Sequence, residues 1–298
     1  MKIIRFETTL ECKIPYSDEK REYTDYGVLI LPDSYSEDKD SPTRMVINCH
    51  GAGGTISTDD SQIEHQTLTK YLLANGYAVM DVNGLPEKYA EEFDIDPRNN
   101  IGSGMAMDFY FAAYDYCIKN FNLYKEIFVH GGSMGGITST NFVLSKKVPV
   151  IAQTCFCPVL DTYNEMFLHP WCDGLPKFAM GKIFSFEKDS EGNYIYDEEK
   201  LRPYNPMQST VVHPCPIYFC QCENDNVVSP EITKQYIERA KSQGVETQLV
   251  LFPEGGHEPQ DYGEPLKEVS GIDVFEGEKL EIRPGVEGAF VWINSRNK

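Results

Sequence analysis

Apolar runs alternate with longer amphipathic segments along most of this chain. Short runs rich in β-branched and aromatic residues predict strands at 2–8, 26–31, 45–48, 77–82, 125–129, 150–155, 217–221 and 247–252. Segments with an apolar side or a helix-start signal predict helices at 60–75, 104–120, 137–144, 230–243 and 287–295. Strands that alternate with helices indicate βαβ units. The expected fold class is therefore α/β, with a mostly parallel sheet and helices on both faces.

Two segments interrupt this alternation. We interpret 1–298 as a single domain, with a cap-like or lid-like insertion at 161–214 and a second insertion at 258–283. Both are expected on the loop side of the sheet, at the carboxyl ends of the strands, where ligands bind in open α/β folds. The first is rich in aromatic residues, which either stack on a ring of the substrate or form the insertion's own core. Within it, His169 and Trp171 are predicted to contact substrate.

Composition narrows the classes of function. The formal net charge of −19 disfavours nucleic acid as a partner, because phosphate binding needs clustered Lys and Arg, and it also disfavours anionic membranes. No apolar stretch is long enough to predict a membrane span. The nine cysteines are scattered and odd in number, so neither a disulfide framework nor a metal site is expected. Without a signal-like N-terminal segment, a cytoplasmic location is predicted.

The strongest chemical motif is the pentapeptide at 131–135, Gly-Gly-Ser-Met-Gly, which follows the predicted strand and precedes a predicted helix. Strand, tight glycine turn with a central serine, and helix together form a nucleophile elbow. Such a turn is strained and leaves little room for side chains beside the serine. Ser133 is therefore the candidate nucleophile.

A glycine-rich loop at 50–54, His-Gly-Ala-Gly-Gly, directly follows another predicted strand. Acyl transfer needs backbone N–H groups aimed at the developing oxyanion. The expected donors are the amide of Met134 and one amide of this loop, with Ala52 preferred over Gly53. The alternative is a loop that cradles phosphate, but the sequence here lacks G-x-x-x-x-G-K-[ST] and does not follow the G-x-G-x-x-G pattern.

An acid and a base follow the serine in sequence. Asp225 comes after the strand at 217–221 and is the candidate that orients a histidine, with Glu223 and Asp161 as alternatives. His257 lies on a glycine loop directly after the strand at 247–252. A histidine on such a loop reaches both the carboxylate and the serine, and acts first as base and then as acid.

The order Ser133, Asp225, His257, with the elbow and the glycine-rich loop, resembles the α/β-hydrolase superfamily over roughly 24–297. The stretch 204–228 is similar to the prolyl-oligopeptidase and dienelactone-hydrolase-like branch, which includes small carbohydrate and feruloyl esterases. One departure is Ala52, where lipase-like relatives have glycine. The resemblance also extends to esterase modules of phage tails, which act outside cells without a signal peptide.

These features predict a serine carboxylic-ester hydrolase that removes an acetyl or aromatic acyl group from a carbohydrate. No cofactor and no metal are implied. One alternative is a serine peptidase. Prolyl oligopeptidases share the triad but usually gate it with a separate propeller domain, and the roughly forty residues before the hydrolase core are too few to form one. The other alternative is a noncatalytic binding protein, which the complete set of triad and oxyanion segments disfavours.

Overall fold

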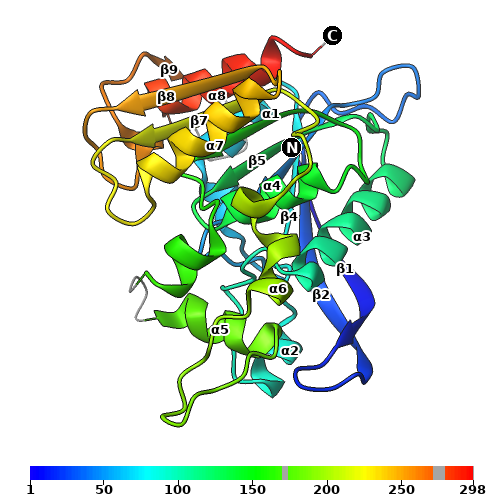
Figure 1. Cartoon of the computed structure of the whole chain (residues 1–298). Coiled ribbons are helices and arrows are strands. Elements are labelled where there is room, and N and C mark those ends of the chain that lie inside the picture. Colours follow the sequence, from blue (N-terminus) through cyan, green and yellow to red (C-terminus); the bar gives the residue numbers. More distant parts are fainter. Residues whose placement is uncertain (170–173, 271–278, 298) are drawn as a thin grey trace.

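A computed structural model describes residues 1–169, 174–270 and 279–297. Eight strands form one sheet in the order β1-β2-β4-β3-β5-β6-β7-β8 (Figure 1). Strands β1 and β2 are antiparallel to their neighbours, whereas β3 to β8 are parallel to one another. The strands are β1 (Lys2–Lys13), β2 (Lys20–Leu31), β3 (Met45–Cys49), β4 (Ala78–Val82), β5 (Ile127–Gly132), β6 (Val150–Phe156), β7 (Ile217–Cys222) and β8 (Thr247–Phe252). The predicted fold class is confirmed.

Helices cover both faces of this sheet, as the continuous apolar strands require. The described α-helices are α1 (Thr67–Ala74), α2 (Glu87–Glu92), α3 (Gly104–Asn120), α4 (Gly135–Leu144), α5 (Leu175–Ile183), α6 (Glu198–Leu201), α7 (Pro230–Ser242) and α8 (Pro284–Asn294). Side chains of α1 and α8 share a buried cluster with one face, and those of α3 and α4 share a cluster with the other. No helix in the described ranges is both long and apolar enough to span a bilayer.

The register of the central strands explains this division into layers. Val46 of β3 lies opposite Phe128 of β5, and both join the cluster that contains α1 and α8. The next pair, Ile47 and Val129, faces the opposite cluster with α3 and α4. Because side chains alternate between faces along a strand, a fully apolar run supplies both cores at once. The carboxyl ends of β3, β5, β6, β7 and β8 then gather at one edge of the sheet, where the predicted site residues follow.

The single helix predicted at 60–75 is wrong. A 3₁₀ turn, Gln62–His65, is separated from α1 by Gln66, whose backbone is extended at φ −72° and ψ 131°. Ile63 and Leu68 both enter the cluster that contains α8. In a continuous helix, residues five apart would point about 140° away from each other. The break at Gln66 therefore allows both side chains to be buried in the same core.

The N-terminal strands are longer than the apolar pattern predicted. Strands β1 and β2 form a hairpin of twelve residues each, whose outer half lies beyond the sequence ranges 2–8 and 26–31. In this outer half Cys12 and Tyr23 reach the core, but most of the residues around them are polar, so the apolar signal in the sequence is weak. At the hairpin's tip, the backbone N–H of Tyr16 donates to Ser185 Oγ at 2.7 Å. The hydroxyl of Tyr16 donates to the Gly181 carbonyl oxygen at 3.2 Å. The hairpin thus contacts the 161–214 insertion.

The described part of this insertion has an aromatic interior of its own. Its elements are a π-helical turn η2 (Thr162–Phe167), α5 and α6, followed by the short turns Arg202–Tyr204 and Pro206–Gln208. Phe167 packs against Tyr196 with ring centroids 5.1 Å apart, and Phe186 packs against both. Lys182 holds the insertion to the end of α2 by donating to the carbonyls of Phe93 and Asp94. In the second insertion, β9 (Lys267–Val269) pairs with β10 (Leu280–Ile282).

Replacement of Tyr16 by Phe tests whether the hairpin steadies the insertion. Loss of the hydroxyl removes its hydrogen bonding to the carbonyls of Gly181 and Phe186, a loss of about 1 kcal/mol. We expect faster cleavage within 161–214 in limited proteolysis, with the products identified by mass spectrometry. The matched control is Tyr124→Phe, because that hydroxyl makes no hydrogen bond within the described part of the chain. Equal cleavage of both variants and the wild type would contradict this role.

Candidate active site

Ser133 lies at the sharp turn between β5 and α4. Its backbone is in the left-handed region at φ 52°, which is strained for a residue with a side chain. Two glycines of the pentapeptide, Gly131 and Gly135, are required by close packing, because a Cβ atom on Gly135 would lie 1.9 Å from the carbonyl oxygen of Cys49. A Cβ atom on Gly131 would lie 2.3 Å from Ser139 Oγ. The close packing of α4 against β3 and β5 therefore explains the glycines at 131 and 135.

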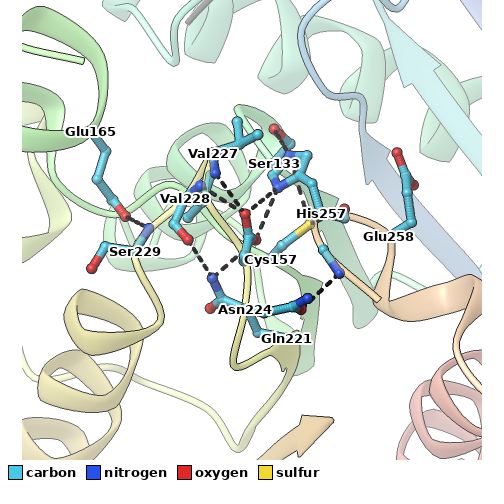
Figure 2. A network of polar contacts seen from close by, with 12 residues as sticks. Ser133, Cys157, Glu165, Gln221, Asn224, Val227, Val228, Ser229, His257 and Glu258 are labelled. Atoms are coloured by element: carbon cyan, nitrogen blue, oxygen red, sulfur yellow. Dashed lines mark hydrogen bonds and ion pairs between the residues drawn. The ribbon is translucent and has the colours of Figure 1, made fainter. Parts of the chain in front are cut away.

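The structure brings the three predicted triad residues together in one relay. His257 Nε2 lies 2.8 Å from Ser133 Oγ, and His257 Nδ1 lies 3.0 Å from Asp225 Oδ2 (Figure 2). The side chain of Asp225 is fully buried, and that of His257 is one-fifth exposed. With Nδ1–H donating to the carboxylate, Nε2 is left to accept the serine proton. The histidine is therefore placed to remove a proton from Ser133 and to carry it to a leaving group.

Asp225 is fixed from several directions. Its Oδ1 accepts the backbone N–H groups of Val227 at 2.9 Å and Val228 at 3.0 Å. Its Oδ2 accepts the side-chain amide of Gln221 at 3.2 Å, and the same amide donates to the Val228 carbonyl. A buried carboxylate whose oxygens accept several hydrogen bonds is held in one orientation. The two alternative acids make no such contact with His257: Glu223 is exposed, and the side chain of Asp161 caps the η2 turn.

The loop that carries His257 is held by two side chains that the sequence did not single out as functional. Asn224 Oδ1 accepts the N–H of Gly256 at 2.9 Å. Cys157 Sγ donates to the His257 carbonyl at 3.2 Å and lies 3.9 Å from His257 Nε2. Burial, with the charge of Asp225 as a second cause, raises the pKa of the Cys157 thiol well above its ordinary value. The thiol is therefore a donor that supports the loop and not a competing nucleophile.

The glycine-rich loop packs directly against the serine turn. A Cβ atom on Gly51 would lie 3.3 Å from both the Gly132 carbonyl oxygen and Ser133 Cβ. The N–H of Gly53 donates to the carbonyl of Arg98, at 3.4 Å. In the described ranges the N–H groups of Ala52 and Met134 have no protein acceptor among the backbone bonds outside helices and strands. Ala52 and Met134 are therefore better placed as oxyanion donors than Gly53.

A buried polar network lies beneath this loop. Asp81 on β4 accepts Asn48 Nδ2 at 2.6 Å and the Tyr110 hydroxyl at 2.7 Å, and it lies 3.3 Å from His50 Nδ1. Asn100 Nδ2 lies 3.4 Å from the other ring nitrogen of His50. All of these side chains are buried. Since His50 begins the glycine-rich loop, the network fixes the loop's origin on the sheet.

A pocket of about 380 Å³ opens beside Ser133. Its lining includes residues of the turn and helix at 62–68 and of the segment 257–261, together with Gly51, Ala52 and Phe156. His130 also lines it, and burial lowers the pKa of this histidine to about 3, so it is neutral. None of the described residues of the 161–214 insertion lines this pocket, and His169 is absent from its walls. Trp171 lies outside the described residues.

The aromatic insertion therefore does not supply the pocket wall that stacking on a substrate ring requires. Its described rings face one another, which matches the alternative that they form the insertion's own core. Phe167 and Phe186 are buried in the main cluster. The predicted contact of His169 with substrate stays a prediction that this pocket does not support.

Cys157, Asp225 and His257 also form a group whose ligand-type atoms lie within 4.8 Å of one another. Both ring nitrogens of His257 already have partners, Ser133 on one side and Asp225 on the other. A metal ion on the imidazole would displace one of these contacts. The donor set therefore fits proton relay better than metal binding.

Comparison with known proteins agrees with this geometry. Residues 64–275 match the model of the prolyl oligopeptidase family. The chain therefore belongs to that family and is a serine hydrolase with the α/β-hydrolase fold, and the resemblance predicted from sequence is confirmed.

Curated relatives extend well beyond the length of this chain. Acylamino-acid-releasing enzyme 1 of Oryza sativa subsp. japonica is 25% identical over 82% of this chain and 31% of its own length. An uncharacterized peptidase of Bacillus subtilis (strain 168) is 25% identical over 77% of this chain and 33% of its own length. The chain thus spans about a third of the length of the curated relatives it matches.

Solved structures show the same fold in chains of different length. A puromycin-hydrolyzing peptidase of Mycobacterium tuberculosis matches with a TM-score of 0.61 at 18% identity, over 84% of this chain and 36% of that chain. A fluorophosphonate-binding serine hydrolase of Staphylococcus aureus matches with a TM-score of 0.57 at 17% identity, over 86% of this chain and 92% of that chain. The fold therefore occurs both as part of a long chain and as nearly the whole of a short one.

Replacement of Gly135 by Ala tests the packing that creates the serine turn. The added methyl group would collide with the backbone of Cys49, so we expect the free energy of unfolding to fall by about 1–3 kcal/mol. Gly132→Ala is the matched control, because a Cβ atom there meets nothing within 4 Å. Chemical denaturation of both variants measures the difference. Equal stability of the two variants would contradict the packing argument.

Proposed function

We propose that this protein hydrolyses amide bonds of N-acylated amino acids or short peptides through an acyl-enzyme formed on Ser133. The observation that carries the proposal is the continuous relay from Asp225 through His257 to the serine hydroxyl, with an open pocket beside it. The amide preference is supported by the curated relatives, which are named as an acylamino-acid-releasing enzyme and a peptidase.

The proposed reaction has two halves, acylation of Ser133 and hydrolysis of the acyl-enzyme, and His257 transfers a proton in each. Ser133 Oγ attacks the carbonyl carbon while His257 Nε2 takes the hydroxyl proton, and the oxyanion receives the N–H groups of Ala52 and Met134. The protonated His257 then gives this proton to the leaving nitrogen, the C–N bond breaks and the amine departs. In the second half, His257 takes a proton from water, which attacks the carbonyl carbon of the acyl-enzyme. The bond to Ser133 Oγ then breaks, the serine recovers its proton from His257, and the acid is released.

Hydrolysis of a carbohydrate ester is the second candidate. The walls of the pocket carry the amide side chains of Gln62, Gln66 and Gln260, each of which both donates and accepts hydrogen bonds. Such groups suit the hydroxyls of a sugar. The same triad would transfer the acyl group to Ser133, and the departing group would be an alcohol in place of an amine.

A substrate panel separates the two candidates. It contains N-acetyl-alanine p-nitroanilide, alanine p-nitroanilide, p-nitrophenyl acetate and an acetylated xylo-oligosaccharide. We expect cleavage of the acylated anilide with a higher kcat/KM than that of the free-amine anilide. Cleavage of the oligosaccharide ester without any anilide cleavage would overturn the amide proposal in favour of the ester.

Replacement of Ser133 by Ala is expected to lower kcat on the order of 10⁶-fold, because the acyl-enzyme no longer forms. The melting temperature should change little, since the hydroxyl's hydrogen bond is to the partly exposed side chain of His257 and not to the core. Rates are measured on the best substrate of the panel. Retained turnover in this variant would exclude Ser133 as the nucleophile.

Replacement of Asp225 by Asn is expected to lower kcat about 10⁴-fold, because the amide no longer holds the His257 tautomer that accepts the serine proton. Glu223→Gln is the matched control. It makes the same chemical change two residues away, on an exposed side chain, and should leave kcat unchanged. A large loss in the control with none in Asp225→Asn would assign the acid to Glu223.

A further inference from the structure

Glu165 is a buried carboxylate that the relay itself does not use. It lies in the η2 turn just after β6, and 2% of the residue is exposed. Its Oε2 accepts the backbone N–H groups of Leu160 at 2.7 Å and Asp161 at 2.9 Å. Its Oε1 accepts the N–H of Ser229 at 3.1 Å. Burial raises its pKa to about 7, against the opposing effect of these three N–H groups.

Ser229 belongs to the same short loop as the triad acid. The N–H groups of Val227 and Val228 point to Asp225 Oδ1, and the next N–H, that of Ser229, points to Glu165 (Figure 2). Helix α7 begins at the next residue, a proline, which has no N–H. Two carboxylates therefore divide between them the three successive N–H groups that lead into α7.

The chemistry of this position requires a carboxylate. One oxygen of Glu165 is occupied by its own segment and the other by Ser229, so both must accept hydrogen bonds. A glutamine of the same shape has only one accepting oxygen, and its NH₂ group would face an N–H group. Because the site is buried, water is not available to relieve that clash.

We propose that Glu165 is a positioning residue for the triad: by holding Ser229 it fixes the 225–229 loop, and through that loop it fixes the Asp225 carboxylate against His257. The inference rests on the proposed role of Asp225. Glu165 joins the start of the aromatic insertion to the acid loop across 64 residues of sequence. It does not line the pocket beside Ser133, so its effect falls on the chemical steps and not on substrate binding.

The first variant is Glu165→Gln, measured on the best substrate of the panel. We expect kcat to fall about 10²-fold, since misplacement of a catalytic group by about 1 Å has an effect of that size, with KM unchanged. Rates are divided by the number of sites that react with a fluorophosphonate probe, so misfolded molecules do not count. Asp161→Asn is the matched control in the same turn, because Asp161 bonds to Tyr163, Asn164 and Asn205 but not to the acid loop.

The second variant, Ser229→Pro, removes the donor and leaves Glu165 intact. The φ of Ser229 is −70°, which a proline ring adopts. It should reproduce the loss in kcat, and the double variant Glu165→Gln/Ser229→Pro should be no slower than either single one. If Glu165→Gln does not fold, this variant decides the question. Normal kcat per reactive site in Ser229→Pro would overturn the proposal.

A double-mutant cycle with Asp225→Asn separates positioning from general stabilisation. If Glu165 acts through Asp225, Glu165→Gln causes little further loss once Asp225 is already Asn. The same factor of loss in both backgrounds would overturn the proposal while leaving the triad intact. Wild-type turnover in Asp225→Asn alone would instead refute the proposed function.

Discussion

The site depends on one backbone constraint, the left-handed turn at Ser133. The turn is strained, and it is maintained because α4 packs so closely on β3 that the backbone at Gly135 touches the carbonyl of Cys49. That contact brings the serine hydroxyl to the carboxyl edge of the sheet, where the loops after β3, β7 and β8 deliver the other groups. The stability of the layered fold is thus what holds Ser133 in place.

Two buried carboxylate systems on opposite sides of the serine hold these loops. Asp81, with His50 and Tyr110, fixes the start of the loop that carries Ala52. Asp225, with Gln221 and the N–H groups of its own loop, fixes His257. In each case a buried, hydrogen-bonded carboxylate orients a neighbouring group of the site, and a site preorganised in this way needs little rearrangement during a reaction.

The sequence predicted the parallel sheet and the triad because their signals are local. A glycine turn around Ser133, and an acid and a histidine just after strands, are visible within a few residues of each position. The break at Gln66 and the contact of Glu165 with Ser229 are not visible in the local sequence, because each arises where distant segments pack together. Among 46 acidic residues, nothing local distinguishes Glu165. The composition of the 161–214 insertion did not show whether its aromatic residues contact substrate or form a core, because both uses favour the same residues.

The proposed reaction requires the acyl group of the substrate to be transferred to Ser133. The most direct measurement is mass spectrometry of the protein after acid quench during turnover of p-nitrophenyl acetate, followed by digestion and mapping of the acyl group. We expect an acyl adduct on the peptide that contains Ser133. Turnover in the wild type with no adduct on that peptide, or with the adduct on another residue, would contradict it.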